Sequence, residues 1–434
     1  MELDHAPRLR DKSRVAAETK PFPRVFWVAL VLELLERLAF YGVYVNLAVY
    51  LTGTVGLSDV ENGSLLGVFA LVRSWVPVGT GAIADRIGFR RSLAIAFALY
   101  IGAYAILFAS PTRPAAWAAV MGMAIGGAFL KPVIPGSVRR HAPEERRAMG
   151  FSLFYASVNA GSVVGKVLTK LVREAVSLRA SMINAIVACA IGLAVTLGFF
   201  REPADAPPPP PKAGERAEAV APEPGKGALA VVTELFGQTR LLVFLVLISG
   251  YYLLIEQFYQ TFPTYIVRSF GESAPREYIT LINPAAIAVF QVVVGRLTKA
   301  LAPTTAMALG VLVGAGSMLL MGAIPTLAGA CGSFFVFAIA EMILAPRYYE
   351  FVSSFAAKGR EGLYMGLSIV PVGIGGLAGG VLSGRLVATY LPKEGPRAPL
   401  VVWGTYAAIG VGCALMLAIY AVWNNRQRPV AAAA

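Results

Sequence analysis

Charge, histidine and paired cysteine are scarce in this 434-residue sequence, and each scarcity excludes a class of protein. Charged residues make up 15% of the chain, whereas a soluble domain carries roughly 25%. The two histidines, His5 and His141, fall in polar stretches, which argues against a histidine metal site or proton relay. Cys189, Cys331 and Cys413 lie inside apolar runs without a CxxC spacing, so we interpret them as small buried residues. No nucleophile, base and orienting group stand together, so we expect neither an enzyme nor a metal or organic cofactor.

Long apolar runs are what the sequence has in abundance. Hydrophobic residues make up 57% of the chain, and its mean hydropathy is +0.65. Apolar runs of about 20 residues can cross roughly 30 Å of hydrocarbon as helices, and lipid favours helices because every backbone amide needs an internal partner. The alternating segments of a membrane β-barrel are not seen. We therefore predict an all-α integral membrane protein with roughly twelve spans, at 25–51, 62–84, 91–109, 115–138, 150–172, 180–200, 241–265, 278–298, 304–324, 327–357, 362–389 and 400–423.

A tract of different composition separates the first six spans from the last six. It contains the proline run Pro207 to Pro211 among alanine and charged residues, and it has no means of burying a core. We interpret it as a solvated linker between two pseudo-symmetric six-helix bundles. The predicted parts are an N-terminal tail (1–24), a first bundle (25–200), the linker (201–227), a second bundle (228–424) and a C-terminal tail (425–434).

The net charge of +13 follows from topology rather than from a nucleic-acid partner. Lysine and arginine gather in the tails, the linker and the loops after the second, fourth and tenth spans, all of which share one side if the span count is even. Because cytoplasmic loops carry the excess of lysine and arginine, both termini are expected in the cytoplasm, with the chain in the cell inner membrane. We expect a monomer.

The first span carries three ionisable side chains, which are costly in a membrane and therefore indicate function. Glu33, Glu36 and Arg37 share one helical face, and Tyr41 follows a turn later. Two acids and one base leave one carboxyl free to take a proton while the other pairs with Arg37. This is the chemistry that proton-coupled transport needs, although a static structural ion pair is the alternative.

Further polar residues are predicted near the middle of other spans. Lys131 lies in the fourth span, Glu256 and Gln257 in the seventh, and Glu341 in the tenth. The cations Arg37 and Lys131 belong to the first bundle and the acids Glu256 and Glu341 to the second. A cavity between the bundles would then have one basic and one acidic wall, which suits a zwitterion of peptide size.

Two other features of the spans are less specific. Arg73 and Lys166 either line the cavity or lie close to a membrane interface, and the sequence leaves both readings open. The glycine cluster between Gly373 and Gly384 lies inside an apolar span, so we interpret it as a helix-packing surface rather than a nucleotide loop.

Two motifs resemble known families. The segment Gly81–Arg91 resembles the loop between the second and third spans of the major facilitator superfamily, which implies that Asp85, Arg86 and Arg90 form a gating cluster on the cytoplasmic side. The segment Glu33–Gly42 resembles the ExxER motif of the proton-dependent oligopeptide transporters in that superfamily.

Other segments extend the resemblance to the oligopeptide transporters. Phe154–Ser162 is similar to the family segment FYxxxNxGS, Lys131 before Pro132 is similar to its fourth-span lysine, and Glu341 is similar to its tenth-span acid. The resemblance implies proton coupling through Glu33, Glu36 and Arg37. It implies a substrate site that includes Arg37 and Lys131 for a carboxylate, Glu341 and Asn159 for an ammonium, and Tyr41 and Tyr155 for the peptide body; the residues themselves suggest Glu256 and Gln257 as further members.

We therefore expect the major facilitator fold and proton-coupled symport of di- or tripeptides, or of similar small zwitterions, by alternating access, driven by the proton gradient. Two alternatives remain at this point. One is a proton-coupled exporter of drugs or metabolites, and the other is a nutrient sensor that keeps the fold without transporting.

Overall fold

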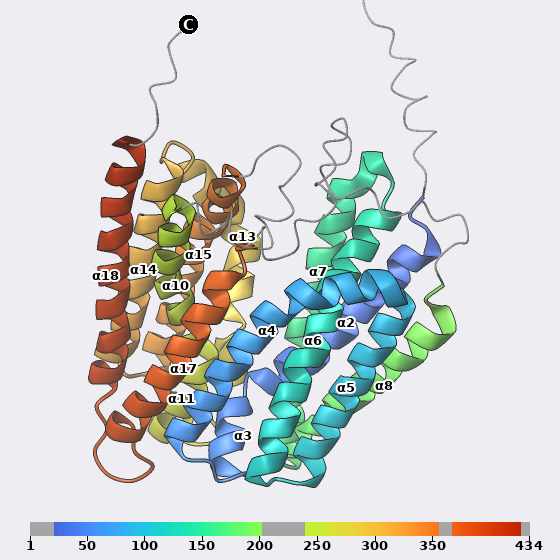
Figure 1. Cartoon of the computed structure of the whole chain (residues 1–434). Coiled ribbons are helices and arrows are strands. Elements are labelled where there is room, and N and C mark those ends of the chain that lie inside the picture. Colours follow the sequence, from blue (N-terminus) through green and yellow to red (C-terminus); the bar gives the residue numbers. More distant parts are fainter. Residues whose placement is uncertain (1–20, 202–238, 356–366, 427–434) are drawn as a thin grey trace, which may run out of the picture.

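The computed structural model describes residues 21–201, 239–355 and 367–426, and every regular element within these ranges is a helix. Figure 1 shows two groups of helices that lie side by side, meet at the lower side of the view and separate toward the upper side, where α18 ends. The first group comprises α2 (Arg24–Tyr44), α3 (Leu47–Gly53), α4 (Asp59–Ile87), α5 (Phe89–Ala109), α6 (Arg113–His141), η1 (Glu144–Arg146), α7 (Arg147–Ala175) and α8 (Ser181–Phe199). The second comprises α10 (Thr239–Gln260), α11 (Phe262–Phe270), α12 (Arg276–Ile279), α13 (Ile282–Leu297), α14 (Pro303–Ala323), α15 (Leu327–Ser353), α17 (Val370–Tyr390) and α18 (Pro399–Arg426).

The helices are long and apolar enough to make this a multi-pass membrane protein. Within the described ranges ten helices qualify as membrane spans, or eleven if the bent pair Asp59–Pro77 and Gly79–Ile87 of α4 is one span. The predicted first span corresponds to α2 and α3, and α2 stays outside this count because Glu33, Glu36 and Arg37 interrupt its apolar sequence. Length and composition therefore establish ten or eleven spans rather than the twelve expected.

Breaks divide at least three of the predicted spans, and the one predicted at 278–298 becomes α12 and α13, with a turn at Thr280 and Leu281. The span predicted at 241–265 becomes α10 and α11, which continues to Phe270. Pro263 stands in the first turn of α11, and its ring and missing amide hydrogen prevent α10 from continuing unchanged. The span predicted at 25–51 breaks before α3 at Asn46, whose backbone (φ −118°, ψ 2°) leaves the helical region. The side chain of Asn46 there reaches Glu277 in the second group.

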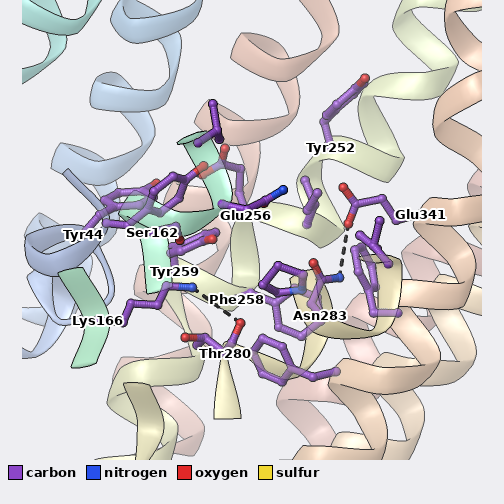
Figure 2. A pocket seen from close by; sticks show the side chains of 18 of the residues that line it. Tyr44, Ser162, Lys166, Tyr252, Glu256, Phe258, Tyr259, Thr280, Asn283 and Glu341 are labelled. Atoms are coloured by element: carbon purple, nitrogen blue, oxygen red, sulfur yellow. Dashed lines mark hydrogen bonds between the residues drawn. The ribbon is translucent and has the colours of Figure 1, made fainter. Parts of the chain in front are cut away.

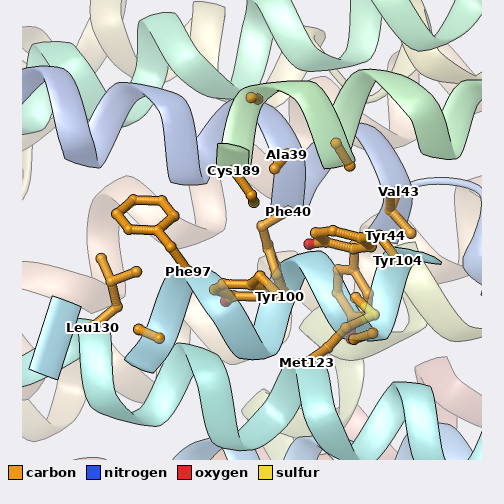
Figure 3. Packing of buried hydrophobic residues seen from close by; sticks show 14 of the residues in the cluster. Ala39, Phe40, Val43, Tyr44, Phe97, Tyr100, Tyr104, Met123, Leu130 and Cys189 are labelled. Atoms are coloured by element: carbon orange, nitrogen blue, oxygen red, sulfur yellow. The ribbon is translucent and has the colours of Figure 1, made fainter. Parts of the chain in front are cut away.

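Each group of helices has its own apolar core, and we call the groups the first and second bundles. One cluster of buried side chains comes from α2 to α8, and the other comes from α10 to α18. Figure 3 shows part of the first cluster, where Phe97 and Tyr100 of α5 lie close to Phe40 of α2 and Cys189 of α8. The bundle boundaries stay predictions, because residues 1–20, 202–238 and 427–434 lie outside the described ranges.

The bundles contact each other most closely along α4 and α17, which lie side by side in Figure 1. A methyl group at Gly380 would lie 2.4 Å from the carbonyl oxygen of Gly63, and one at Gly375 would lie 2.3 Å from that of Ser249. Only glycine allows backbones to approach this closely. The prediction that the glycines between Gly373 and Gly384 form a packing surface is confirmed.

Candidate functional site

A cavity of about 360 Å³ lies between the bundles. Its lining comes from α2, α4 and α7 of the first bundle and from α10, α13, α15 and α17 of the second. Figure 2 shows Lys166 on one side of this cavity and Glu341 on the other. The volume is within the roughly 300–1,000 Å³ of small-molecule sites, so the cavity can hold a compact ligand in contact with both bundles.

An ion pair joins the bundles at the cavity. Arg73 of α4 and Glu256 of α10 lie 2.8 Å apart, between Nη2 and Oε1, and the hydroxyl of Tyr44 donates to Oε2 at 2.8 Å. The Arg73 guanidinium also lies 5.5–5.7 Å from the ring centroids of Phe40, Tyr44 and Phe69. Such stacking is favourable for a cation. The charge of Arg73 is therefore already compensated.

Lys166 of α7 is held far more loosely. Its side chain lines the cavity, and the residue is only 2% exposed. The Nζ atom lies 3.5 Å from the carbonyl oxygen of Thr280, at the long limit for a hydrogen bond, and 5.6 Å from the ring centroid of Tyr41. Within the described ranges no carboxylate forms an ion pair with it. An ammonium group has three donors, so Lys166 keeps binding capacity toward the cavity.

Glu341 of α15 is the corresponding acid on the second bundle. Its Oε2 atom accepts a hydrogen bond from the side-chain amide of Asn283 at 3.2 Å, and both side chains line the cavity. No cation pairs with Glu341 among the residues that the structure describes. The cavity therefore has an uncompensated cation from one bundle and an uncompensated acid from the other.

The three charges of α2 form a separate cluster inside the first bundle. The Nε atom of Arg37 lies 2.6 Å from Oε1 of Glu33 and 3.2 Å from Oε2 of Glu36, and the hydroxyl of Tyr100 donates to Oε1 of Glu36 at 2.8 Å. Glu33 and Glu36 are only 1% and 3% exposed. A Cβ atom at Gly161 of α7 would lie 2.8 Å from the Cβ of Arg37, so glycine lets α7 close against this cluster. Two carboxylates thus share one guanidinium, so one of them can bind a proton while the other stays paired with Arg37.

Four of the side chains proposed from the sequence for substrate binding line the cavity, namely Tyr41, Asn159, Glu256 and Glu341. They come from both bundles, on α2, α7, α10 and α15. Figure 2 labels two of them, Glu256 and Glu341, which both come from the second bundle.

The other four proposed substrate residues are not among the described residues that line the cavity. Arg37 is held by the acids of its own helix, and the Nζ atom of Lys131 donates to the carbonyl oxygen of Arg73 at 3.0 Å. Tyr155 is 63% exposed, and the side-chain amide of Gln257 donates to the carbonyl of Leu253 one turn earlier. The basic side of the cavity is therefore built by Arg73 and Lys166, the two cations that the sequence left open.

The residues proposed for gating lie where α4 turns into α5. Gly88 separates these helices at φ +86°, a conformation that favours glycine. Asp85 and Arg86 are exposed, and Arg90 donates to the carbonyl oxygen of Leu197 in α8. Among the described residues no ion pair joins Asp85 to Arg86 or Arg90, so in this conformation no such pair closes that end.

The opposite end, which we call the closed end, is tied by ion pairs between the bundles. Arg268 at the end of α11 makes two contacts with Asp59 at the start of α4, at 3.0 and 2.6 Å. The two side chains are 6% and 15% exposed. Such a two-contact pair between an arginine and a carboxylate fixes orientation as well as charge, so it holds α4 against α11.

A second cluster at the closed end has a fully buried core. Arg173 of α7 contacts both carboxylate oxygens of Glu277 in α12, at 2.7 and 3.0 Å, and the side-chain amide of Asn46 donates to the same carboxylate at 2.9 Å. Arg276 donates to Asn46 in turn, and Arg276 and Glu277 are both 0% exposed. The sequence does not predict this cluster, because nothing along the chain pairs Arg173 or Arg276 with Glu277.

The lining of the cavity offers charged and polar groups to a ligand. Among the described residues, no three histidine, cysteine, aspartate or glutamate side chains gather closely enough to hold a metal ion. The uncompensated Lys166 and Glu341 can each receive one charged group of a ligand that carries both signs.

Comparisons with known proteins agree with this architecture. Residues 29–380 match the sequence profile of the Major Facilitator Superfamily. The dipeptide and tripeptide permease B of Xenorhabdus bovienii (strain SS-2004) is 33% identical over 163 residues, which are 36% of this chain and 32% of that protein. The chain thus spans about a third of the length of the curated relatives that it matches.

Solved structures match over nearly the whole chain and show the fold. The transporter PepTSo of the POT family superposes with a TM-score of 0.76 and 17% identity, covering 94% of this chain and 100% of that one. The nucleoside transporter NupG superposes with a TM-score of 0.73 and 15% identity, covering 91% of this chain and 98% of that one.

Proposed function

From the premise that the chain belongs to the major facilitator superfamily, and is a multi-pass membrane transporter rather than an enzyme, we propose that it carries a di- or tripeptide, or a similar small zwitterion, together with a proton. The partial similarity to dipeptide and tripeptide permeases supports this substrate class. The observation that carries the proposal is the cavity between the bundles, where Lys166 of one bundle and Glu341 of the other have no oppositely charged partner among the residues that the structure describes.

The ammonium group of the substrate binds Glu341. The carboxylate of Glu341 has one hydrogen-bond donor, Asn283, and keeps acceptor capacity toward the cavity. Its position near the middle of α15 places it far from either end of the helix. The other acid of the cavity, Glu256, is occupied by Arg73 and Tyr44, which belong to the opposite bundle.

The proton binds the cluster of Glu33, Glu36 and Arg37. Protonation of one acid leaves Arg37 paired with the other, so the cluster stays neutral with the proton and is negative without it. Because a carboxyl takes a proton more readily when no cation is near, any movement that withdraws Arg37 from Glu36 favours proton binding. The proton moves inward down its gradient, and a membrane potential that is negative inside adds about 2.3 kcal/mol per charge per 100 mV.

The topology follows from the same premise. The eleven candidate spans, with the bent α4 counted once, become twelve when α2 is added as a charged span, in two six-helix bundles. The excess of lysine and arginine on one side of the membrane favours a cytoplasmic location for both termini. The proposed membrane is the cell inner membrane, and the proposed oligomeric state is a monomer. The conformation is then open to the cytoplasm, with the ion pairs Asp59–Arg268 and Arg173–Glu277 closing the outer side.

The proposal is tested by uptake into proteoliposomes that hold the purified full-length chain. An inward proton gradient should drive accumulation of labelled alanyl-alanine above its external concentration, and a protonophore should abolish it. Labelled uridine, tested in the same vesicles, should not accumulate.

Three outcomes contradict the proposal and point elsewhere. Accumulation of uridine without the peptide indicates a nucleoside carrier. Outward pumping of a cationic dye without peptide uptake indicates an exporter, and peptide binding without accumulation indicates a sensor.

A further inference from the structure

The proposed function leaves open which cation receives the carboxylate of the substrate. The first bundle offers four candidates near the middle of its helices: Arg37, Arg73, Lys131 and Lys166. The residue that binds the substrate carboxylate has to line the cavity. It must not already be paired with an acid of the protein, because that ion pair would have to break first.

Three of the candidates fail one of these conditions. Arg37 lies within 2.6 and 3.2 Å of two carboxylates of its own helix. Arg73 lies 2.8 Å from the carboxylate of Glu256 and stacks on three rings. Lys131 donates to the backbone of Arg73 and is not among the described residues that line the cavity.

Lys166 meets both conditions. It lines the cavity, it is 2% exposed, and its only hydrogen bond that the structure describes is the 3.5 Å contact with the carbonyl oxygen of Thr280. In Figure 2 its Nζ atom lies beside Thr280 and below Tyr259, on the side of the cavity opposite Glu341. A buried ammonium with one long contact to a neutral oxygen is poorly compensated, and a ligand carboxylate would compensate it.

We propose that Lys166 is the anchor for the carboxylate of the substrate, and that this carboxylate replaces the contact of Lys166 with the carbonyl oxygen of Thr280. The inference rests on the proposed function, and it assigns to Lys166 the part that the sequence gave to Arg37 and Lys131. The substrate then spans the cavity, with its ammonium on Glu341 of α15 and its carboxylate on Lys166 of α7.

The anchor also lies next to the closed end. The contact between Lys166 and Thr280 joins the two bundles, and Thr280 follows Glu277 within one helical turn. Arg173, which holds Glu277, lies seven residues after Lys166 on α7, about two turns away. Binding of a carboxylate at Lys166 therefore breaks the contact between Lys166 and Thr280, and the bundles are then connected at this point through the substrate.

The test measures binding by calorimetry of purified protein with two probes, alanyl-alanine and its C-terminal amide, which lacks the carboxylate charge. The wild type should bind the free acid at least about 30-fold more tightly than the amide, as expected for a desolvated charge pair. Lys166→Gln should bind both probes with equal affinity. Lys166→Arg should restore most of the preference. Lys170→Gln, on the same helix, removes a lysine that pairs with Glu174 and should keep the full preference.

The possible failures are distinguishable. If the wild type prefers the free acid and Lys166→Gln keeps that preference, the inference is overturned while the proposed function stands, and loss of the preference in Arg37→Gln or Lys131→Gln would identify the true anchor. If the wild type binds the two probes equally, Lys166 is not a carboxylate anchor. If it binds neither probe, the proposed function is overturned together with the inference. Elution of Lys166→Gln in gel filtration as a single peak at the wild-type position shows that the variant is folded.

Discussion

Neutralising Glu277 should shift the protein away from the conformation described here. This carboxylate is 0% exposed and receives three hydrogen bonds, two from Arg173 and one from Asn46. Arg173 and Asn46 belong to the first bundle and Glu277 to the second, so these bonds hold the closed end together. The variant Glu277→Gln removes the negative charge and leaves Arg173, whose side chain is 6% exposed, with Glu174 as its remaining carboxylate partner among the described residues, 3.7 Å away and 40% exposed.

The size of the effect follows from this geometry. Breaking a buried ion pair by removing one partner costs about 3–5 kcal/mol. We expect the lower value, about 3 kcal/mol, because the amide oxygen of glutamine still accepts one hydrogen bond. A penalty of this size changes a conformational equilibrium by roughly 150-fold. The penalty falls only on the state in which the closed end is closed, so the alternative state should become populated.

A distance measurement between the bundles at the opposite end detects this shift. Spin labels at Met149→Cys of α7 and Leu297→Cys of α13 report it, because these residues are 50% and 78% exposed and each lies at the far end of its helix from the closed end. The labels go into a variant that lacks the three native cysteines. In the parent the distance distribution should hold a long component, and Glu277→Gln should add a shorter component as that end closes.

A neighbouring acid supplies the matched control. Glu272 lies in the same segment and pairs with Arg276 at 3.4 Å, but its side chain is 68% exposed. Exposed pairs contribute about 1 kcal/mol or less, so Glu272→Gln should leave the distribution unchanged. The reasoning is refuted if both variants match the parent, or if both shift equally.

Three further variants test other parts of the account. Glu256→Gln leaves Arg73 without its carboxylate and should lower the apparent melting temperature in detergent by a few degrees, since the pair is partly buried; an unchanged transition would mean that the pair contributes nothing. Gly380→Val introduces a side chain where a methyl group already comes within 2.4 Å of the Gly63 carbonyl. It should abolish uptake while gel filtration shows an intact monomer, and normal uptake would contradict the close packing of α4 and α17. Glu341→Gln should remove the preference for alanyl-alanine over its N-acetyl form, from about 30-fold to near equality in competition assays; a retained preference would place the ammonium elsewhere.

Most of the membrane helices could be predicted from the sequence. Apolar runs of helical length locate most helices within a few residues, because lipid leaves the chain few alternatives. The break at Asn46 could not be predicted, because it depends on the contact of Asn46 with Glu277, far away along the chain. The break between α10 and α11 has a local signal, Pro263, which a reading by hydropathy alone does not use.

The candidate site was only partly predictable. Charge in a membrane helix singles out functional candidates, and Glu256 and Glu341 were found in this way. Which cation faces the cavity depends on helix rotation and on competing partners. Arg37 turns to the acids of its own helix and Lys131 to the backbone of Arg73, whereas Lys166 faces the second bundle. A single sequence contains no signal that ranks these three.

The most direct test of the account is whether a peptide carries a proton with it, and whether Glu36 is required. Alanyl-alanine is added to proteoliposomes that contain a pH-sensitive dye, with no initial pH gradient and a membrane potential that is negative inside. The wild type should acidify the lumen when the peptide is added and not when uridine is added. Glu36→Gln should leave the luminal pH constant while still binding the peptide. Acidification of the same size in Glu36→Gln, or its absence in a wild type that takes up the peptide, would contradict the proton-coupled mechanism.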